Sequence, residues 1–240
     1  MSDRFGPRGT FAVIIPLQNA NMQPEYEAMR PEGINNQIYR FDISAHDNAS
    51  DAILRAVPGC KLCWPDMIIS GVSLEMHAWS RGQQVDFRTK FAAQAQGTPT
   101  VLAPDATEAA LKTIGAERIG ILTPMSAENS KRAQDYYEAA GFEVPYTTSL
   151  NVKKSEEIIN VTIEQIQAGF EAIDHDDVDT LLHVGGALGI VGMIDDLEAR
   201  FGKPVVSVNA ATYWYALRRH GITDPMPGFG RLLMKKSVVE

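Results

Sequence analysis

Short runs rich in β-branched residues alternate with longer stretches of helical periodicity along the whole chain. Such alternation predicts parallel strands joined by crossover helices that cover both faces of a sheet. The strands are expected at residues 11–17, 37–43, 67–70, 100–103, 118–122, 144–149, 180–184 and 205–208. The chain is therefore predicted to be an α/β protein.

The clearest helix is expected over residues 155–174. Apolar side chains recur there at helical spacing, namely Ile159, Ile163, Ile166, Phe170 and Ile173. The glutamates of the segment lie mostly off this stripe. We interpret the stripe as buried core rather than as a cofactor contact.

The second half of the chain repeats the first. Residues 99–107 and 204–212 share Pro, Val, Ala and Thr at one constant offset. The elements before them also correspond, because residues 14–16 resemble residues 122–124 and residues 69–71 resemble residues 183–185. The sequence thus predicts two pseudo-symmetric halves, each a parallel sheet flanked by helices.

Two such halves are expected to face each other, with the site in the cleft between them at the carboxyl ends of the strands. The segment after the last helix, from residue 225 on, is expected to cross back onto the first half. The first domain is therefore predicted to comprise residues 1–115 plus 212–240, and the second domain residues 116–211.

The composition narrows the possible partners. Apolar residues make up 45% and charged residues 22% of the chain, as in an ordinary globular protein. The net charge of −8 comes from scattered acids, whereas binding to a nucleic acid requires clustered lysines and arginines. No apolar run is long enough for a membrane span or a signal peptide, so we expect a cytoplasmic protein, with a homo-oligomer as one option.

The only two cysteines, Cys60 and Cys63, form a C-x-x-C pattern. A structural zinc ion needs about four ligands, and no second Cys/His pair lies at usable spacing. A thioredoxin-type motif opens a helix, whereas this pair is expected at the end of one, just before the third strand. We therefore expect no metal and no redox role here.

Four strand ends are expected to point into the cleft, at residues 16–19, 70–73, 123–126 and 184–187; each precedes a helix or loop, and two of them contain glycine. Glycine lets backbone N–H groups approach a ligand closely, and a helix N-terminus adds partial positive charge. Glycines at strand ends also serve simple tight turns. Four such ends together favour a receptor for a small carboxylate.

Several motifs occur in the order found in one known group of enzymes. They are Ile14-Ile15-Pro16-x-x-Asn19, Gly71-x-Ser73, Gly185-Gly186 and Gly228-Phe229-Gly230-Arg231-Leu232. The chain resembles the arylmalonate decarboxylase and maleate isomerase group of the aspartate/glutamate racemase superfamily. The resemblance implies a two-domain α/β fold that acts on a carboxylate substrate without a cofactor.

In that group a cysteine follows the third strand of each half and flanks the substrate. By the resemblance, these positions fall on Gly71, a replacement that arylmalonate decarboxylases share, and on Val184. Neither residue can shed or regain a proton as a thiol does. Cys60 and Cys63 are expected at the opposite end of their strand, so the resemblance predicts a site without its usual thiols.

The residues left to bind a substrate include polar and apolar groups. Asn19, Ser73, Ser126 and the N–H groups of Gly185 and Gly186 are expected to hold a carboxylate. Val72 and Met125 replace polar residues of the relatives and make the cleft more apolar. The predicted binding set is Asn19, Gly71, Val72, Ser73, Met125, Ser126, Val184, Gly185 and Gly186.

Three side chains are candidates for proton transfer. His77 lies four residues beyond Ser73, and Glu75 lies between them. His183 precedes Val184, and strand alternation then directs it away from the cleft if Val184 faces the cleft. Imidazole suits proton transfer near neutral pH, so His77 and His183 are predicted alongside Glu75.

Decarboxylation needs less of the protein than isomerisation, since burying one carboxylate and stabilising an enediolate can drive loss of CO₂. The leading hypothesis is therefore a cofactor-independent lyase, most simply a decarboxylase of a small carboxylic or dicarboxylic acid. Two alternatives stay open: a cis–trans isomerase or hydratase of a maleate-like diacid, and a carboxylate-binding relative without catalysis.

Overall fold

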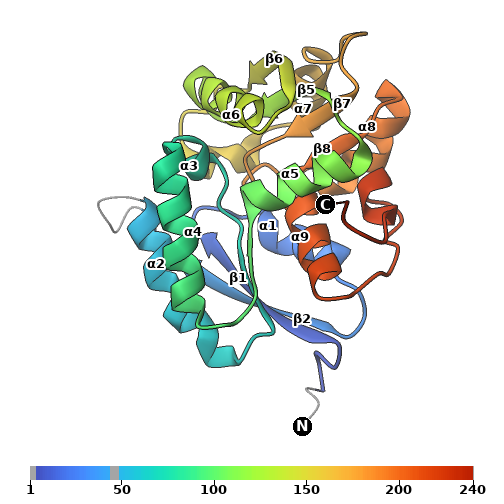
Figure 1. Ribbon diagram of the computed structural model, residues 1–240. Helices are drawn as coiled ribbons and strands as arrows, with labels where there is room; N and C mark the ends of the chain where they lie inside the picture. Colours follow the sequence, from blue (N-terminus) through green and yellow to red (C-terminus); the bar gives the residue numbers. More distant parts are fainter. Residues whose placement is uncertain (1–3, 44–48, 240) are drawn as a thin grey trace.

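The computed structural model describes residues 4–43 and 49–239 (Figure 1). They form two four-stranded sheets in which every neighbouring pair of strands is parallel, and helices flank each sheet. The eight strands lie within three residues of their expected starts and ends. The predicted α/β fold with two similar halves is therefore confirmed.

The first half contains β1 (Gly9–Pro16), α1 (Met22–Met29), β2 (Ile34–Phe41), α2 (Ala49–Cys60), the 3₁₀ turn η1 (Lys61–Cys63), β3 (Met67–Ser70), α3 (Leu74–His77), α4 (Arg81–Ala95), β4 (Thr100–Leu102) and α5 (Ala103–Ile114). Its strand order is β2-β1-β3-β4. The central strand β1, buried except at Pro16, places its carboxyl end beside that of β3.

The second half contains β5 (Arg118–Thr123), α6 (Ala127–Ala139), β6 (Glu143–Ser149), η2 (Ser155–Asn160), α7 (Ile163–Glu171), β7 (Thr180–His183), η3 (Val191–Met193), α8 (Ile194–Phe201), β8 (Val205–Ser207), α9 (Val208–Arg219) and η4 (Arg231–Met234). Its strand order, β6-β5-β7-β8, repeats that of the first half. Figure 1 shows α5 and α9 side by side between the two sheets, and these helices pack directly against each other.

The single helix predicted over residues 155–174 is wrong. A 3₁₀ segment, η2, ends at Asn160, and α7 begins after Thr162, whose hydroxyl accepts a hydrogen bond from Gln165 N–H. Gln165 Oε1 in turn accepts a hydrogen bond from the Thr162 N–H, which completes a capping box. Ile159 and Ile163 are consequently more than half exposed, at 57% and 56%, whereas the later members of the stripe are buried.

The C-terminal segment contacts both halves. Val239 N–H donates to Thr113 Oγ1 of α5 at 3.0 Å, while Gly230 N–H donates to Asp195 Oδ1 of α8 at 2.7 Å. Arg231 N–H also donates to Glu198 Oε2 of α8. The division of the chain into residues 1–115 plus 212–240 and residues 116–211 stays a prediction.

The C-x-x-C cysteines lie at the end of α2 and in η1, as expected, just before β3. Both are free thiols, with Cys60 buried and Cys63 exposed. Burial raises the pKa of the Cys60 thiol. Among the described helices, none is long and apolar enough to cross a membrane.

Arg218 of α9 fixes the C-terminal segment. Its guanidinium is buried and donates to the carbonyl oxygens of Lys235 at 2.7 Å and Ile222 at 2.7 Å. It also reaches the carbonyls of Asp224 and Leu233. Burial lowers its pKa, and the four carbonyl oxygens offset the cost of placing a charged guanidinium in the interior.

We expect Arg218→Met to lower the free energy of unfolding by about 2–4 kcal/mol, because the buried hydrogen bonds from the guanidinium to four carbonyl oxygens are lost. Urea unfolding of the two proteins measures the difference. Arg219→Met, at the exposed neighbouring position, should change it by no more than about 0.5 kcal/mol. Equal effects of the two substitutions would contradict the role assigned to Arg218.

Candidate active site

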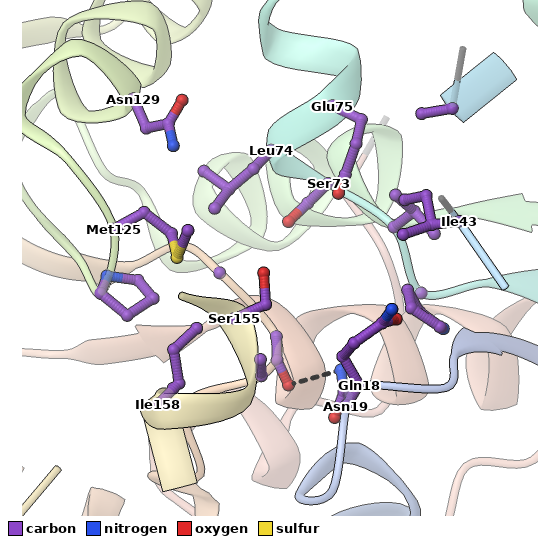
Figure 2. Close-up of a pocket in the computed structure, with 18 of the residues that line it drawn as sticks. Gln18, Asn19, Ile43, Ser73, Leu74, Glu75, Met125, Asn129, Ser155 and Ile158 are labelled. Atoms are coloured by element: carbon purple, nitrogen blue, oxygen red, sulfur yellow. Dashed lines mark hydrogen bonds between the residues drawn. The ribbon is translucent and has the colours of Figure 1, made fainter. Parts of the chain in front are cut away.

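A cavity of about 380 Å³ lies between the two halves, at the carboxyl ends of β1, β3, β5 and β7. Figure 2 shows Ser73 and Glu75 on one side of it and Met125 and Asn129 on the other. The lining comes from both halves, so the predicted position of a cleft between them is confirmed. The strands place loops here because parallel strands end at one edge of each sheet.

Eight of the predicted site residues line this cavity: Asn19, Gly71, Val72, Ser73, Glu75, Met125, Gly185 and Gly186. Four do not: Ser126, Val184, His77 and His183. The loops that follow β1, β3, β5 and β7 were therefore placed at the cavity from the sequence. The exceptions have separate physical reasons.

Ser126 caps α6. Its hydroxyl accepts a hydrogen bond from Asn129 N–H at 3.4 Å, which satisfies one of the free donors at the helix start. Val184 is completely buried within the hydrophobic core, and its N–H donates to Leu122 O of β5. Val184 therefore continues the sheet pairing of β7 and does not reach the cavity.

His77 points away from the cavity, toward α6. Its ring packs against Tyr136 and Tyr137, with centroids 4.5 and 5.4 Å away. Both ring nitrogens are buried without a hydrogen-bond partner among the described residues. Burial lowers the pKa of His77 to about 3, so the ring is neutral at pH 7.

His183 is also outside the cavity. It is fully buried in β7, between β5 and β8, and within the described chain neither ring nitrogen has a partner. Burial is the main cause that lowers its pKa to about 3. Of the three candidates for proton transfer, only Glu75 lines the cavity.

Sequence reasoning missed several polar residues of the cavity. Asn129 and Arg132 lie three positions apart on α6 and so share one face of that helix. Gln18 Oε1 is buried and finds no partner in residues 4–43 or 49–239. Ser155 and Ile158 line the cavity from η2, the segment misread as part of a long helix.

Among the described residues, four that line the cavity, two from each half, have unpaired backbone donors. Within the described chain, the N–H groups of Val72, Ser73, Gly185 and Gly186 have no protein acceptor. Val72 and Ser73 follow β3, and the two glycines follow β7. Such N–H groups are strong donors that require a partner when they are removed from water. A carboxylate or an oxyanion can supply that partner.

Gly185 owes its identity to two constraints. Its φ of +122° is a conformation that side chains rarely adopt, and a Cβ atom would lie 2.5 Å from Pro124 Cδ of the opposing loop. The glycine therefore allows the loops after β5 and β7 to meet. The close approach of Gly185 to Pro124 therefore fixes one wall of the cavity by protein contacts alone.

Asn19 is held at both ends of its side chain. Its Nδ2 donates to Gly186 O at 3.1 Å (Figure 2, dashed line). Its Oδ1 accepts from the N–H groups of Asn21 and Met22, at 3.2 and 2.9 Å. Asn19 thus fixes the start of α1 against the loop after β7 and leaves one amide hydrogen for a ligand.

The buried carboxylate of Glu25 is linked through Asn209 to the same carbonyl oxygen, Gly186 O. Asn209 Nδ2 donates to Gly186 O at 2.9 Å and to Glu25 Oε2 at 2.6 Å. Glu25 Oε1 accepts from Val191 N–H at 2.7 Å. Burial is the largest influence on Glu25 and raises its pKa to about 7, against the opposing effect of these hydrogen bonds.

Glu75 has the electrostatics of a proton donor. It lines the cavity beside Ser73, and burial raises the pKa of its carboxyl group. A bound carboxylate would raise that pKa further, since two like charges disfavour each other. The cavity lining contains no cysteine, and the described residues contain no cluster of three potential metal ligands.

Residues 67–233 match the family model described as arylmalonate decarboxylase. The chain belongs to the arylmalonate decarboxylase family. The resemblance inferred from the sequence motifs is therefore confirmed, and the family consists of enzymes.

The curated relatives of this chain include maleate isomerases and an arylmalonate decarboxylase. A maleate isomerase from Nocardia farcinica is 28% identical over 130 residues, which span 54% of this chain and 52% of that protein. An arylmalonate decarboxylase from Bordetella bronchiseptica is 28% identical over 144 residues, spanning 58% of this chain and 59% of that protein. The chain thus matches about half the length of such curated relatives.

Solved structures share the fold. The maleate cis-trans isomerase of Nocardia farcinica superimposes with a TM-score of 0.85 at 20% identity, over 94% of this chain and 97% of that one. A structure of an arylmalonate decarboxylase gives a TM-score of 0.77 at 18% identity, over 94% and 99%. A mutant of the Nocardia enzyme carries a covalently bound succinylcysteine intermediate.

We expect Glu25 to make the stability of the protein decrease as the pH rises from about 4.5 to about 7. Its pKa is about 7 when folded against a model value of 4.5, so the folded state binds more protons in this window. The expected loss is on the order of 2–3 kcal/mol, and Glu25→Gln should remove it.

Denaturant unfolding at several pH values measures this effect as the difference between the wild type and the variant. Glu27→Gln, on the exposed side of the same helix, is the matched control and should leave the wild-type pH dependence in place. The same slope in Glu25→Gln as in the wild type would show that another group is responsible.

Proposed function

We propose that the chain is a cofactor-independent lyase, most simply a decarboxylase, that acts on a small carboxylic or dicarboxylic acid without a catalytic cysteine. The observation that carries the proposal is the set of N–H groups at Val72, Ser73, Gly185 and Gly186 that have no acceptor in residues 4–43 and 49–239. They belong to residues of both halves that line one cavity, and a receptor for a carboxylate and its enediolate requires such donors.

The carboxylate that leaves as CO₂ requires apolar surroundings, unlike the retained carboxylate, which requires hydrogen-bond donors. Val72, Leu74, Met125 and Ile158 provide apolar lining, in which a carboxylate loses hydration. As the bond to this carboxylate breaks, CO₂ departs and the bonding electron pair moves into the remaining carboxylate. The resulting enediolate carries its charge on two oxygens, which the backbone N–H groups stabilise.

Glu75 then supplies the proton. Its raised pKa favours the protonated carboxyl group, which donates its hydrogen to the α-carbon of the enediolate and becomes a carboxylate. Solvent returns the proton to Glu75 after product release. His77 and His183 have no part in this scheme, since both face away from the cavity and are neutral at pH 7.

The test is incubation with malonate, substituted malonates and related diacids while CO₂ release is followed. Release from at least one acid is expected, and release from none would overturn the lyase proposal. Binding of the same acids by calorimetry, without turnover of any of them, would instead support a carboxylate-binding protein without catalysis.

We expect Glu75→Gln to lower kcat at least about 100-fold, because the amide cannot donate an acidic proton. In the wild type kcat/KM should fall as the pH rises through the raised pKa of Glu75, since the general acid must be protonated. The measurement is the pH profile of CO₂ release. Glu32→Gln, at an exposed position outside the cavity, should change neither the rate nor the profile.

A second candidate function is cis–trans isomerisation of an unsaturated diacid. The observation that favours it is Asn19, which lines the cavity and keeps one amide hydrogen for a ligand, together with the match to maleate isomerases. Conversion of maleate to fumarate, followed by ultraviolet absorbance, tests it. Because Val184 is buried outside the cavity, Val184→Cys is expected to give no new isomerase activity by itself.

Arg132 favours a diacid over a monoacid. It is the only Lys or Arg in the described cavity lining, and its partner Glu128 is largely exposed. We expect Arg132→Gln to weaken diacid binding about fivefold and to leave monoacid binding unchanged. A change in affinity of about fivefold is what the loss of one half-exposed ion pair produces. Calorimetry at low salt measures this, with Lys131→Gln on the same helix as the control.

A further inference from the structure

The side-chain tip of Met22 lies between two glycines that line the cavity. Met22 begins α1 and is 1% exposed. Gly71 follows β3 in the first half, and Gly186 follows β7 in the second half. The methionine therefore lies under the floor of the cavity, where the two halves meet.

The space beside each glycine is already filled. A Cβ atom on Gly71 would lie 2.3 Å from Met22 Sδ and 2.7 Å from Met22 Cε. A Cβ atom on Gly186 would lie 2.6 Å from the same Cε. A methionine tip normally moves aside easily, but movement away from one glycine brings this tip closer to other packed atoms.

The backbone of Met22 cannot move away either. Its N–H donates to Asn19 Oδ1 at 2.9 Å, and Asn19 Nδ2 donates to Gly186 O. Asn21 Nδ2, at the N-cap of α1, donates to Ala187 O at 2.8 Å, so two side chains hold the start of α1 against the loop after β7. The backbone at Gly71 does not have a positive φ, so only the methionine prevents a side chain at this position.

We propose that Met22 is the specificity-determining residue of this cavity: its thioether fills the space into which a substituent of the bound acid would extend. It thereby restricts the site to acids with small substituents. The thioether is apolar and has no acidic proton, so the floor excludes water and cannot protonate an intermediate. This inference rests on the proposed function, in which a small acid occupies the cavity and Glu75, in the cavity lining, donates the proton.

The first arm of the test measures the binding of malonates that carry hydrogen, methyl, ethyl or propyl, by calorimetry. In the wild type the affinity should fall as the substituent grows. Met22→Ala removes three heavy atoms, and we expect it to bind propylmalonate at least tenfold more tightly than the wild type does. An unchanged order of affinities in Met22→Ala would overturn the proposal.

Met29→Ala is the matched control. Met29 lies on the same helix and is equally buried, but a Cβ atom on Gly71 or Gly186 would not have it among its nearest contacts. Its truncation should lower the thermal midpoint about as much as Met22→Ala does. The order of affinities should remain that of the wild type, and a shift equal to that of Met22→Ala would contradict a specific role of Met22.

The second arm does not depend on any acid. Gly71→Cys alone should lower the thermal midpoint, and its thiol should resist iodoacetamide. When Gly71→Cys is combined with Met22→Ala, the thermal midpoint should recover, and iodoacetamide should label the thiol at position 71, as located by mass spectrometry. The effects of the two substitutions on the midpoint should therefore not add. A stable single variant, or a double variant that is not recovered, would overturn the occupancy of this space by Met22.

The two arms separate the two proposals. If no acid binds to any variant, the proposed function fails, and the labelling arm alone decides whether Met22 occupies this space. If acids bind and the labelling behaves as expected but the affinities keep their order, the site is correct and Met22 does not set its size limit.

Discussion

The carbonyl oxygen of Gly186 joins the two halves of the molecule. It accepts hydrogen bonds from Asn19, which precedes the first helix of one half, and from Asn209, in the first turn of the last α-helix of the other. Asn209 also donates to the buried Glu25. Because buried polar groups are costly unless they are paired, separating the halves here would leave several donors and acceptors without partners. The shape of the cavity depends on this contact.

The repeat in the sequence was sufficient to predict the sheets, the cleft and the loops that line it. Strand-forming runs are short and bounded, and parallel strands leave little freedom in where their carboxyl ends lie. Gly71, Ser73 and Gly185 could therefore be placed in one cavity although they are far apart in sequence. The break at Thr162 was missed because apolar spacing continued through it, although the spacing of Thr162 and Gln165 gave a capping signal.

Side-chain direction at the ends of short elements could not be predicted in the same way. His77 lies on α3, a helix of only four residues. A side chain on such a short helix faces either the cavity or the tyrosines of α6, depending on its exact position in the single turn. Strand alternation suggested that only one of His183 and Val184 faces the cleft, yet the cleft begins beyond both of them. Asn129 and Arg132 come from a helix whose apolar pattern is weak, so only the packing of α6 reveals that they line the cavity.

The contact between Met22 and Gly71 also has an evolutionary consequence. A long side chain at position 22 and any side chain at position 71 compete for the same volume. Under this epistasis, a mutation that introduces cysteine at position 71 is selected against until position 22 has first become smaller. A lineage that carries this pair therefore needs two ordered mutations to place a thiol at position 71.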